Sequence, residues 1–223
     1  EGQKAPAEAE SKPTEVKEEA VAGKAAAEET GEIALFNGKD LSGWKTNRAE
    51  GSFTVKDGVL VGHSLDLRSH LFYVGGASEP VAFKDFEFVI VAKGDPDSNS
   101  GIFFHTDYEL RDDLGHLANG YEVNLNTSPS VTRKTGSLYD VVDLKEQPLD
   151  DTQWFETRIR VAGKRIEVWL DGEVVVDYLE PENPIRKPNR KGRLLNPNGG
   201  AIALQAHDPE SVWFFKEIRI KEL

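Results

Sequence analysis

The feature that most constrains the fold is a series of short stretches in which apolar and polar residues alternate with a period of two. The clearest examples cover residues 154–161, 165–170 and 173–178, and the turns between them are Ala162-Gly163-Lys164 and Asp171-Gly172. Asp-Gly between two alternating stretches is a strong β-hairpin signal. The three stretches therefore predict an antiparallel meander with one packed face and one wet face.

Similar stretches recur along most of the chain. Asp57-Gly58 separates two further apolar stretches as a hairpin turn, and strand-like segments continue to the end at Leu223. After Glu32, no helical period of 3.6 residues persists for more than about two turns. Many short strands without intervening helices predict an all-β fold, a β-sandwich of the jelly-roll type, formed by a single domain over residues 33–223.

Residues 1–32 differ from the rest of the chain, because they are almost wholly Ala, Glu, Lys, Pro, Thr and Gly and include no aromatic residue. Such a segment cannot bury enough apolar surface to offset the entropy of ordering, so we predict a disordered tail or tether. The sequence starts at Glu1 and contains no methionine. We therefore expect an upstream segment such as a signal peptide, and a bacterial protein that is exported to the periplasm, the cell surface or the medium.

Composition restricts the partners and the chemistry. The formal net charge of −12 argues against a nucleic-acid partner, since proteins that bind the phosphate backbone carry a basic surface. No apolar run approaches the roughly 18 residues of a membrane span. The absence of cysteine excludes disulfides, thiol catalysis and thiolate metal sites.

The strict alternation of residues 121–126 predicts a half-buried strand, and this strand carries the first candidate for function. Side chains alternate between the two faces of a strand, so Glu122, Asn124 and Asn126 share one face. A carboxylate and two amides in a row suit either solvent or a hydrogen-bonding ligand such as a sugar. An ordinary glycosidase needs two carboxylates about 5 to 9.5 Å apart, and this strand offers only one, which argues against that class.

Other candidates are more weakly indicated. Gln205 and His207 alternate at the end of an apolar stretch and so face the same side, where His207 is either functional or a turn residue that caps the strand. Trp44, like the other tryptophans, belongs either to the core or to a platform on which a sugar ring stacks. Residues 95–106 resemble a calcium loop, but its glycine and its final glutamate are out of place. The basic loop 186–193 is expected to be solvated.

Together, several short motifs resemble the bacterial 3-keto-disaccharide hydrolase family, whose fold is a concanavalin/laminarinase-like jelly roll. The resemblance extends from about Ile33 to Leu223. In chain order its motifs are Leu35-Phe36-Asn37-Gly38-Lys39-Asp40-Leu41-Ser42-Gly43-Trp44, Asp57-Gly58-Val59-Leu60, Asn99-Ser100-Gly101-Ile102-Phe103-Phe104, Gly120-Tyr121-Glu122-Val123, Thr135-Gly136-Ser137-Leu138-Tyr139-Asp140, Ile202-Ala203-Leu204-Gln205-Ala206-His207 and Ile218-Arg219-Ile220-Lys221.

The resemblance implies cleavage of glycosides whose sugar is already oxidised at C3. It implies that Glu122 and His207 serve as base and acid, and that Gln205 and Tyr139 orient the sugar. The partner is then a carbohydrate. No cofactor is predicted, although a divalent metal is thought to serve some members of the family, and the resemblance admits one here.

The chain departs from the family pattern at three positions. His105 stands where the family usually has Arg, and Asn124 and Asn126 stand where it usually has Gln and Asp. We count His105, Asn124 and Trp44 among the residues expected to contact the sugar. These departures imply either a different substrate or a chain that keeps the fold without the activity. The alternatives are a non-catalytic carbohydrate-binding jelly roll, tethered through the tail, and a structural role.

Overall fold

The structure is a computed structural model that describes residues 31–223, so the predicted disordered tail lies outside the described residues except for Gly31 and Glu32. The described chain forms thirteen strands and one 3-10 helix. These are β1 (Ile33–Ala34), β2 (Trp44–Thr46), β3 (Phe53–Lys56), β4 (Val59–His63), β5 (Ser69–Tyr73), β6 (Phe86–Gly94), β7 (Asn99–Thr106), β8 (Tyr121–Asn126), β9 (Phe155–Ala162), β10 (Arg165–Leu170), β11 (Glu173–Leu179), η1 (Pro188–Arg190), β12 (Ala201–Ala206) and β13 (Val212–Glu222).

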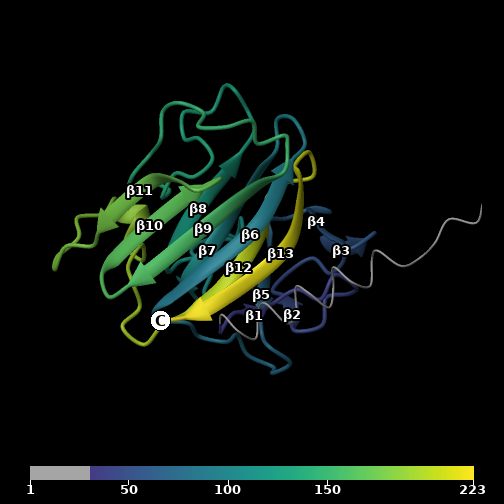
Figure 1. Cartoon of the computed structure of the whole chain (residues 1–223), viewed down its shortest axis with the longest axis horizontal. Helices are drawn as coiled ribbons and strands as arrows, with labels where there is room; N and C mark the ends of the chain where they lie inside the picture. The colour runs from purple at the N-terminus through teal and green to yellow at the C-terminus, as the bar shows by residue number, and fades with distance from the viewer. Residues whose placement is uncertain (1–30) are drawn as a thin grey trace, which may run out of the picture.

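The strands build two antiparallel sheets that lie face to face (Figure 1). The larger sheet has the order β11-β10-β9-β6-β13-β4-β3, with β1 also paired to β13. The smaller sheet has the order β2-β5-β12-β7-β8. The predicted all-β jelly-roll sandwich is therefore confirmed. No helix among the described residues is long and apolar enough to cross a membrane.

The predicted hairpins form where the turn chemistry requires them. Asp57 and Gly58 connect β3 to β4 with φ angles of 52° and 80°, and Asp171 and Gly172 connect β10 to β11 with 46° and 83°. Two consecutive residues with positive φ are typical of the type I′ turn, whose twist matches that of the flanking strands. The meander β9-β10-β11 is present as predicted.

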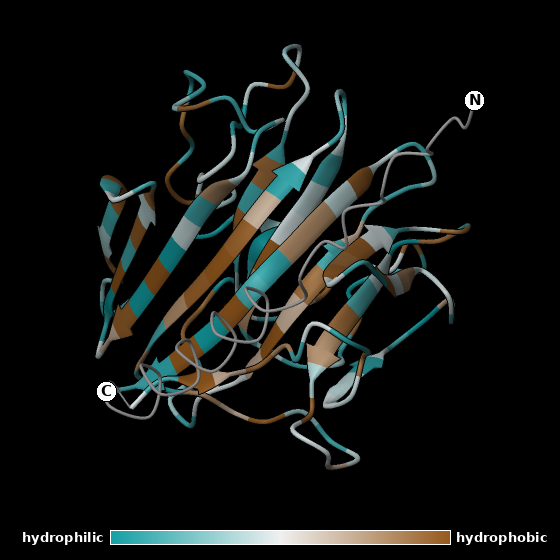
Figure 2. Ribbon diagram, turned by 45° about the vertical axis from the view of Figure 1, so that its right-hand side comes forward, coloured by the Kyte–Doolittle hydropathy of each residue, from teal (hydrophilic) through white to brown (hydrophobic). Residues whose placement is uncertain are grey.

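The hydrophobic core lies between the sheets. Along β9, every second residue from Phe155 to Val161 is buried, and the residues that alternate with these are partly exposed. Figure 2 shows the same alternation as teal and brown bands along the strands of the larger sheet. On the smaller sheet, Tyr121, Val123 and Leu125 of β8 point into this core.

The opposite face of the smaller sheet is also covered, which differs from the half-buried strand predicted at 121–126. All six residues of β8 are buried. The segment 133–139 runs along the free edge of β8, because Asn124 N donates to Ser137 O and Tyr139 N donates to Glu122 O, each at 2.9 Å. The alternation predicted correctly which residues share a face, but it carried no information about the segments that cover that face.

Candidate functional site

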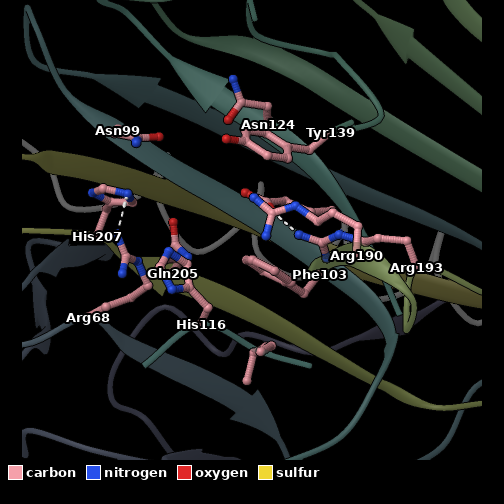
Figure 3. A pocket seen from close by; sticks show the side chains of 12 residues that line it. Arg68, Asn99, Phe103, His116, Asn124, Tyr139, Arg190, Arg193, Gln205 and His207 are labelled. Carbon is pink, nitrogen blue, oxygen red and sulfur yellow. Dashed lines mark hydrogen bonds and ion pairs between the residues drawn. The ribbon is translucent and has the colours of Figure 1, made fainter. Parts of the chain in front are cut away.

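A cavity of about 50 Å³ lies on the covered outer face of the smaller sheet (Figure 3). Residues from β7, β8 and β12 form its floor, and residues from the segments that connect strands form its walls. The lining residues are Arg68, Asn99, Phe103, His116, Leu117, Glu122, Asn124, Tyr139, Arg190, Arg193, Gln205 and His207.

Strand register brings the floor residues together. Phe103 of β7 lies opposite Glu122 of β8, and Gly101 lies opposite Asn124. A Cβ atom added to Gly101 would approach Glu122 Oε1 to 3.0 Å. The missing side chain at residue 101 therefore leaves the space that the carboxylate of Glu122 occupies.

Glu122 is almost fully enclosed and forms an ion pair with Arg193. Arg193 Nη2 donates to Glu122 Oε2 at 2.5 Å, and the side chain of Glu122 is 10% exposed and that of Arg193 5%. Burial raises the pKa of the Glu122 carboxyl, while the charge of Arg193 restrains that rise by stabilising the carboxylate. A carboxylate of raised pKa is a stronger base than an exposed glutamate, which suits it to remove a proton from carbon.

The 180–200 loop, which connects β11 to β12, brings Arg190 and Arg193 to the cavity. Asp140 anchors the middle of this loop by accepting hydrogen bonds from Lys187 Nζ at 2.6 Å and Arg190 Nε at 2.9 Å. Burial of Asp140 opposes its ionisation, but these two bonds and the nearby charge of Arg133 outweigh that effect and lower its pKa to about 2.

Tyr139 forms the adjoining wall. Two guanidinium groups lie over its ring, with Arg133 Cζ at 4.7 Å and Arg190 Cζ at 5.3 Å from the ring centroid. This cation–π arrangement fixes the ring at the side of the cavity, beside Asn124 in Figure 3. Asn124 is itself oriented by a hydrogen bond from its Nδ2 to Arg133 O at 2.9 Å.

His207 is held in one tautomer at the other side of the cavity. Its Nδ1–H donates to Asp208 Oδ2 at 2.5 Å, and its Nε2 accepts a hydrogen bond from Arg68 Nη2 at 2.6 Å. Burial and the charge of Arg68 lower the pKa of His207, so the imidazole is neutral near pH 7. Figure 3 shows the contact between His207 and Arg68 at the cavity edge.

Gln205 completes the floor from β12, opposite His70 of β5. Its Nε2 donates to the fully buried His70 Nε2 at 3.0 Å. Its Oε1 is buried and has no hydrogen-bond partner among the described residues. A buried acceptor without a partner favours a ligand donor, because an unmade hydrogen bond costs about 1 to 3 kcal/mol.

The structure thus brings five of the seven predicted residues to one cavity: Glu122, His207, Gln205, Tyr139 and Asn124. Their roles stay predictions.

The other two predicted residues lie elsewhere. His105 has a positive φ of 53° at a bulge in β7, accepts a hydrogen bond from Asn196 N at 3.0 Å, and binds Lys84 O at 2.9 Å through its other nitrogen. It therefore ties β7 to two loops. Trp44 packs in the core and donates from Nε1 to Leu35 O at 2.8 Å. One edge of Trp44 borders a separate open depression, lined also by Lys45 and Glu50.

Sequence reasoning missed the arginines of the cavity. The 186–193 loop was expected to be solvated, but Arg193 is 4% exposed, so that expectation is wrong for this residue. The one available signal was Glu122 itself, because a buried carboxylate on a strand requires a cation nearby. Nothing local to the sequence indicated which of the basic residues supplies it.

The donor set of the cavity does not fit a metal ion. Within residues 31–223, no three His, Asp or Glu side chains form a group that could hold one. Glu122 is paired with Arg193, and both ring nitrogens of His207 already have partners.

Comparison with known proteins finds one matching family model. The model of a family described as "3-keto-alpha-glucoside-1,2-lyase-like domain" matches residues 31–221. No curated protein matches the sequence.

Three solved structures show the likeness in fold. A candidate glycosyl hydrolase from Parabacteroides distasonis has a TM-score of 0.74 at 23% identity, covering 89% of this chain and 96% of that one. The exoplasmic domain of VIP36, bound to Ca²⁺ and a mannose-containing glycan, has a TM-score of 0.54 at 13% identity. The match covers 86% of this chain and 88% of that one. A carbohydrate-binding module from Bacillus subtilis has a TM-score of 0.50 at 15% identity. The match covers 80% of this chain and 95% of that one.

Proposed function

The chain belongs to the 3-keto-alpha-glucoside-1,2-lyase-like family, and from that premise we propose that it cleaves glycosides whose sugar carries a ketone at C3. The observation that carries this proposal is the charge pattern of the cavity. Its lining includes a single carboxylate, Glu122, together with three guanidinium groups. This pattern suits a reaction that needs one base and several groups to stabilise negative charge, and it does not suit paired carboxylates.

The C3 ketone makes the C2 proton acidic. Glu122 removes that proton, and the electron pair of the C2–H bond forms an enolate across C2, C3 and the ketone oxygen. The enolate then expels the oxygen substituent at C1, which leaves as an alcohol once protonated, and a C1–C2 double bond forms. Water adds at C1 and a proton returns to C2, giving the free 3-keto sugar. The cavity arginines are the groups available to stabilise the enolate oxygen.

His207 is the proposed acid for the leaving oxygen, and its state defines a condition for that role. In the free protein it is neutral, and its Nε2 accepts a hydrogen bond from Arg68. Acid catalysis requires Nε2 to be protonated and released from Arg68. Because burial lowers the pKa of His207, a proton on Nε2 is available only at acidic pH unless the substrate raises that pKa.

The test is turnover of a 3-keto-disaccharide and of its unoxidised parent, followed by release of the free 3-keto sugar. We expect the wild-type protein to cleave only the oxidised sugar, and Glu122→Gln to reduce kcat by about 10²- to 10⁴-fold, the usual contribution of a general base. Glu167→Gln is the matched control, because Glu167 also pairs with an arginine on a strand, at 3.0 Å from Arg160, but lies in the other sheet. Unchanged turnover in Glu122→Gln would contradict the proposal.

A second candidate function is binding of carbohydrate without catalysis. It is favoured by the way the polar groups of the cavity are paired with one another, Glu122 with Arg193 and His207 with Arg68. Binding of unoxidised glycans in the same cavity, with no turnover of either sugar, would support this function over the first.

A further inference from the structure

Arg68 is a cation of the cavity that lacks a carboxylate partner. Its Nη2 contacts the neutral His207 Nε2 at 2.6 Å, and its Nη1 donates to Leu114 O at 3.0 Å. Its Nε is buried and has no partner, and no Asp or Glu within residues 31–223 lies within ion-pair distance of it. Both partners of Arg68 are neutral, so they satisfy hydrogen bonds without compensating its charge.

The carboxylates whose charges act on Arg68 are already paired with other groups. Glu122 pairs with Arg193 at 2.5 Å, Asp208 with His207 at 2.5 Å, and Asp112 with His116 at 2.8 Å. They act on Arg68 only at longer range, and burial lowers the pKa of its guanidinium. A half-buried charge without a counter-ion costs free energy that a bound anion would recover.

The cavity lining carries the opposite charge to the protein as a whole. The chain has a formal net charge of −12, yet the cavity lining holds three arginines against one carboxylate. Arg190 and Arg193 are each engaged by an acidic side chain, Asp140 and Glu122. Arg68 is therefore the arginine whose charge is left for a ligand. Cavities lined by one sign of charge concentrate ions of the opposite sign.

We propose that Arg68 binds an anionic substituent of the glycoside, a carboxylate or a sulfate, and that acidic glycosides are the preferred ligands of this cavity. The planar guanidinium matches both anions in geometry. His207, fixed by Asp208, positions Arg68 through its Nε2. The identification of these glycosides as substrates rests on the proposed function, whereas the preference for an anion concerns binding alone.

The test is calorimetric titration of the full chain, residues 1–223, with methyl glucoside, methyl glucuronide and methyl glucoside 6-sulfate. We expect one or both acidic sugars to bind about 10- to 100-fold more tightly than the neutral sugar, the equivalent of one charge-assisted hydrogen-bonding site. The tighter of the two identifies the substituent as carboxylate or sulfate. In Arg68→Gln the ratio of the affinities for the acidic and the neutral sugar should fall to about one, and Arg68→Lys should retain part of the preference.

Arg48→Gln is the matched control. Arg48 Nη1 donates to Asp113 O at 3.2 Å, next to the carbonyl that Arg68 contacts, but Arg48 does not line the cavity. Equal affinities for the three sugars in the wild-type protein would overturn the proposal, as would a preference that survives in Arg68→Gln or is lost equally in Arg48→Gln. If Arg68→Gln does not fold, the wild-type protein is titrated at high salt instead. We then expect the preference for the acidic sugars to be lost while the affinity for the neutral sugar is unchanged.

These titrations are independent of turnover. A protein that prefers acidic sugars but cleaves no 3-keto-glycoside would retain the anion site and refute the proposed function. A protein that binds the three methyl glycosides equally well but cleaves a 3-keto-disaccharide would refute the anion site and retain the proposed function.

Discussion

At the scale of single residues, the chemistry of the cavity depends on how strongly Glu122 holds its proton. Two opposing effects act on this carboxyl. Burial destabilises the charged form and raises its pKa, and the positive charge of Arg193 stabilises the charged form. Because the proposed base is the carboxylate, the balance between these effects sets the lowest pH at which the protein is active.

This balance predicts the acidic limb of the pH profile. As pH falls through the raised pKa, Glu122 takes up a proton and kcat/KM is lost. This loss occurs above pH 4.5, because 4.5 is the ordinary pKa of a glutamate and the pKa of Glu122 is raised from it. In Arg193→Gln the stabilising charge is gone, so the pKa of Glu122 rises further and the limb moves to higher pH. The measurement is kcat/KM against pH for both proteins, with Arg165→Gln as the control, since Arg165 pairs with Asp177 in the larger sheet, away from the cavity. A limb that stays fixed or moves to lower pH in Arg193→Gln would show that the base is another group.

At the scale of elements, the cavity depends on the 180–200 loop, which brings two of its three arginines. Two sets of contacts fix this loop. Asp140 accepts hydrogen bonds from Lys187 and Arg190, and Glu180 accepts hydrogen bonds from the hydroxyl of Tyr121 and from Leu195 N. Both anchors join the loop to segments far away in the sequence, so the position of Arg193 follows from tertiary contacts.

We therefore predict that Asp140→Asn loosens this wall of the cavity. The amide keeps the shape but loses the charge, which removes hydrogen bonds to cations worth about 1.5 to 3 kcal/mol each. We expect faster amide hydrogen exchange over residues 187–195, a higher KM and, because hydrogen bonds to cations are weakened, a lower melting temperature. Asp177→Asn is the control, because Asp177 accepts two hydrogen bonds from Arg165 on an exposed edge strand. Exchange rates over 187–195 that match the wild type would contradict this account of the loop.

At the scale of the whole molecule, the two faces of the smaller sheet have different roles. One face of the smaller sheet completes the hydrophobic core, and the other carries Glu122, Asn124 and Gln205 into the cavity. This division follows from the period of two along each strand, since a side chain and its neighbour must lie on opposite faces. A strand that supports the core and the site at once holds its polar side chains on a rigid frame.

The same period explains how much the sequence could predict. Hairpins such as that at Asp171-Gly172 are local, so their turn residues and flanking alternation were sufficient. The placement of Glu122, Asn124 and Gln205 on one side also followed from alternation and from the family resemblance. The pairing of Glu122 with Arg193 joins residues 71 positions apart through an irregular loop, and no local pattern encodes it. For the same reason, His105 could not be recognised as a tie between loops.

The central claim is that the reaction proceeds through removal of the C2 proton by a single base, and solvent labelling tests it most directly. A 3-keto-disaccharide is cleaved in D₂O, and the deuterium at C2 of the released 3-keto sugar is measured by mass spectrometry and NMR, corrected for exchange of the free sugar. We predict one deuterium at C2 in each product molecule from the wild-type protein. A product that forms at the enzymatic rate with its original hydrogen still at C2 would contradict the account.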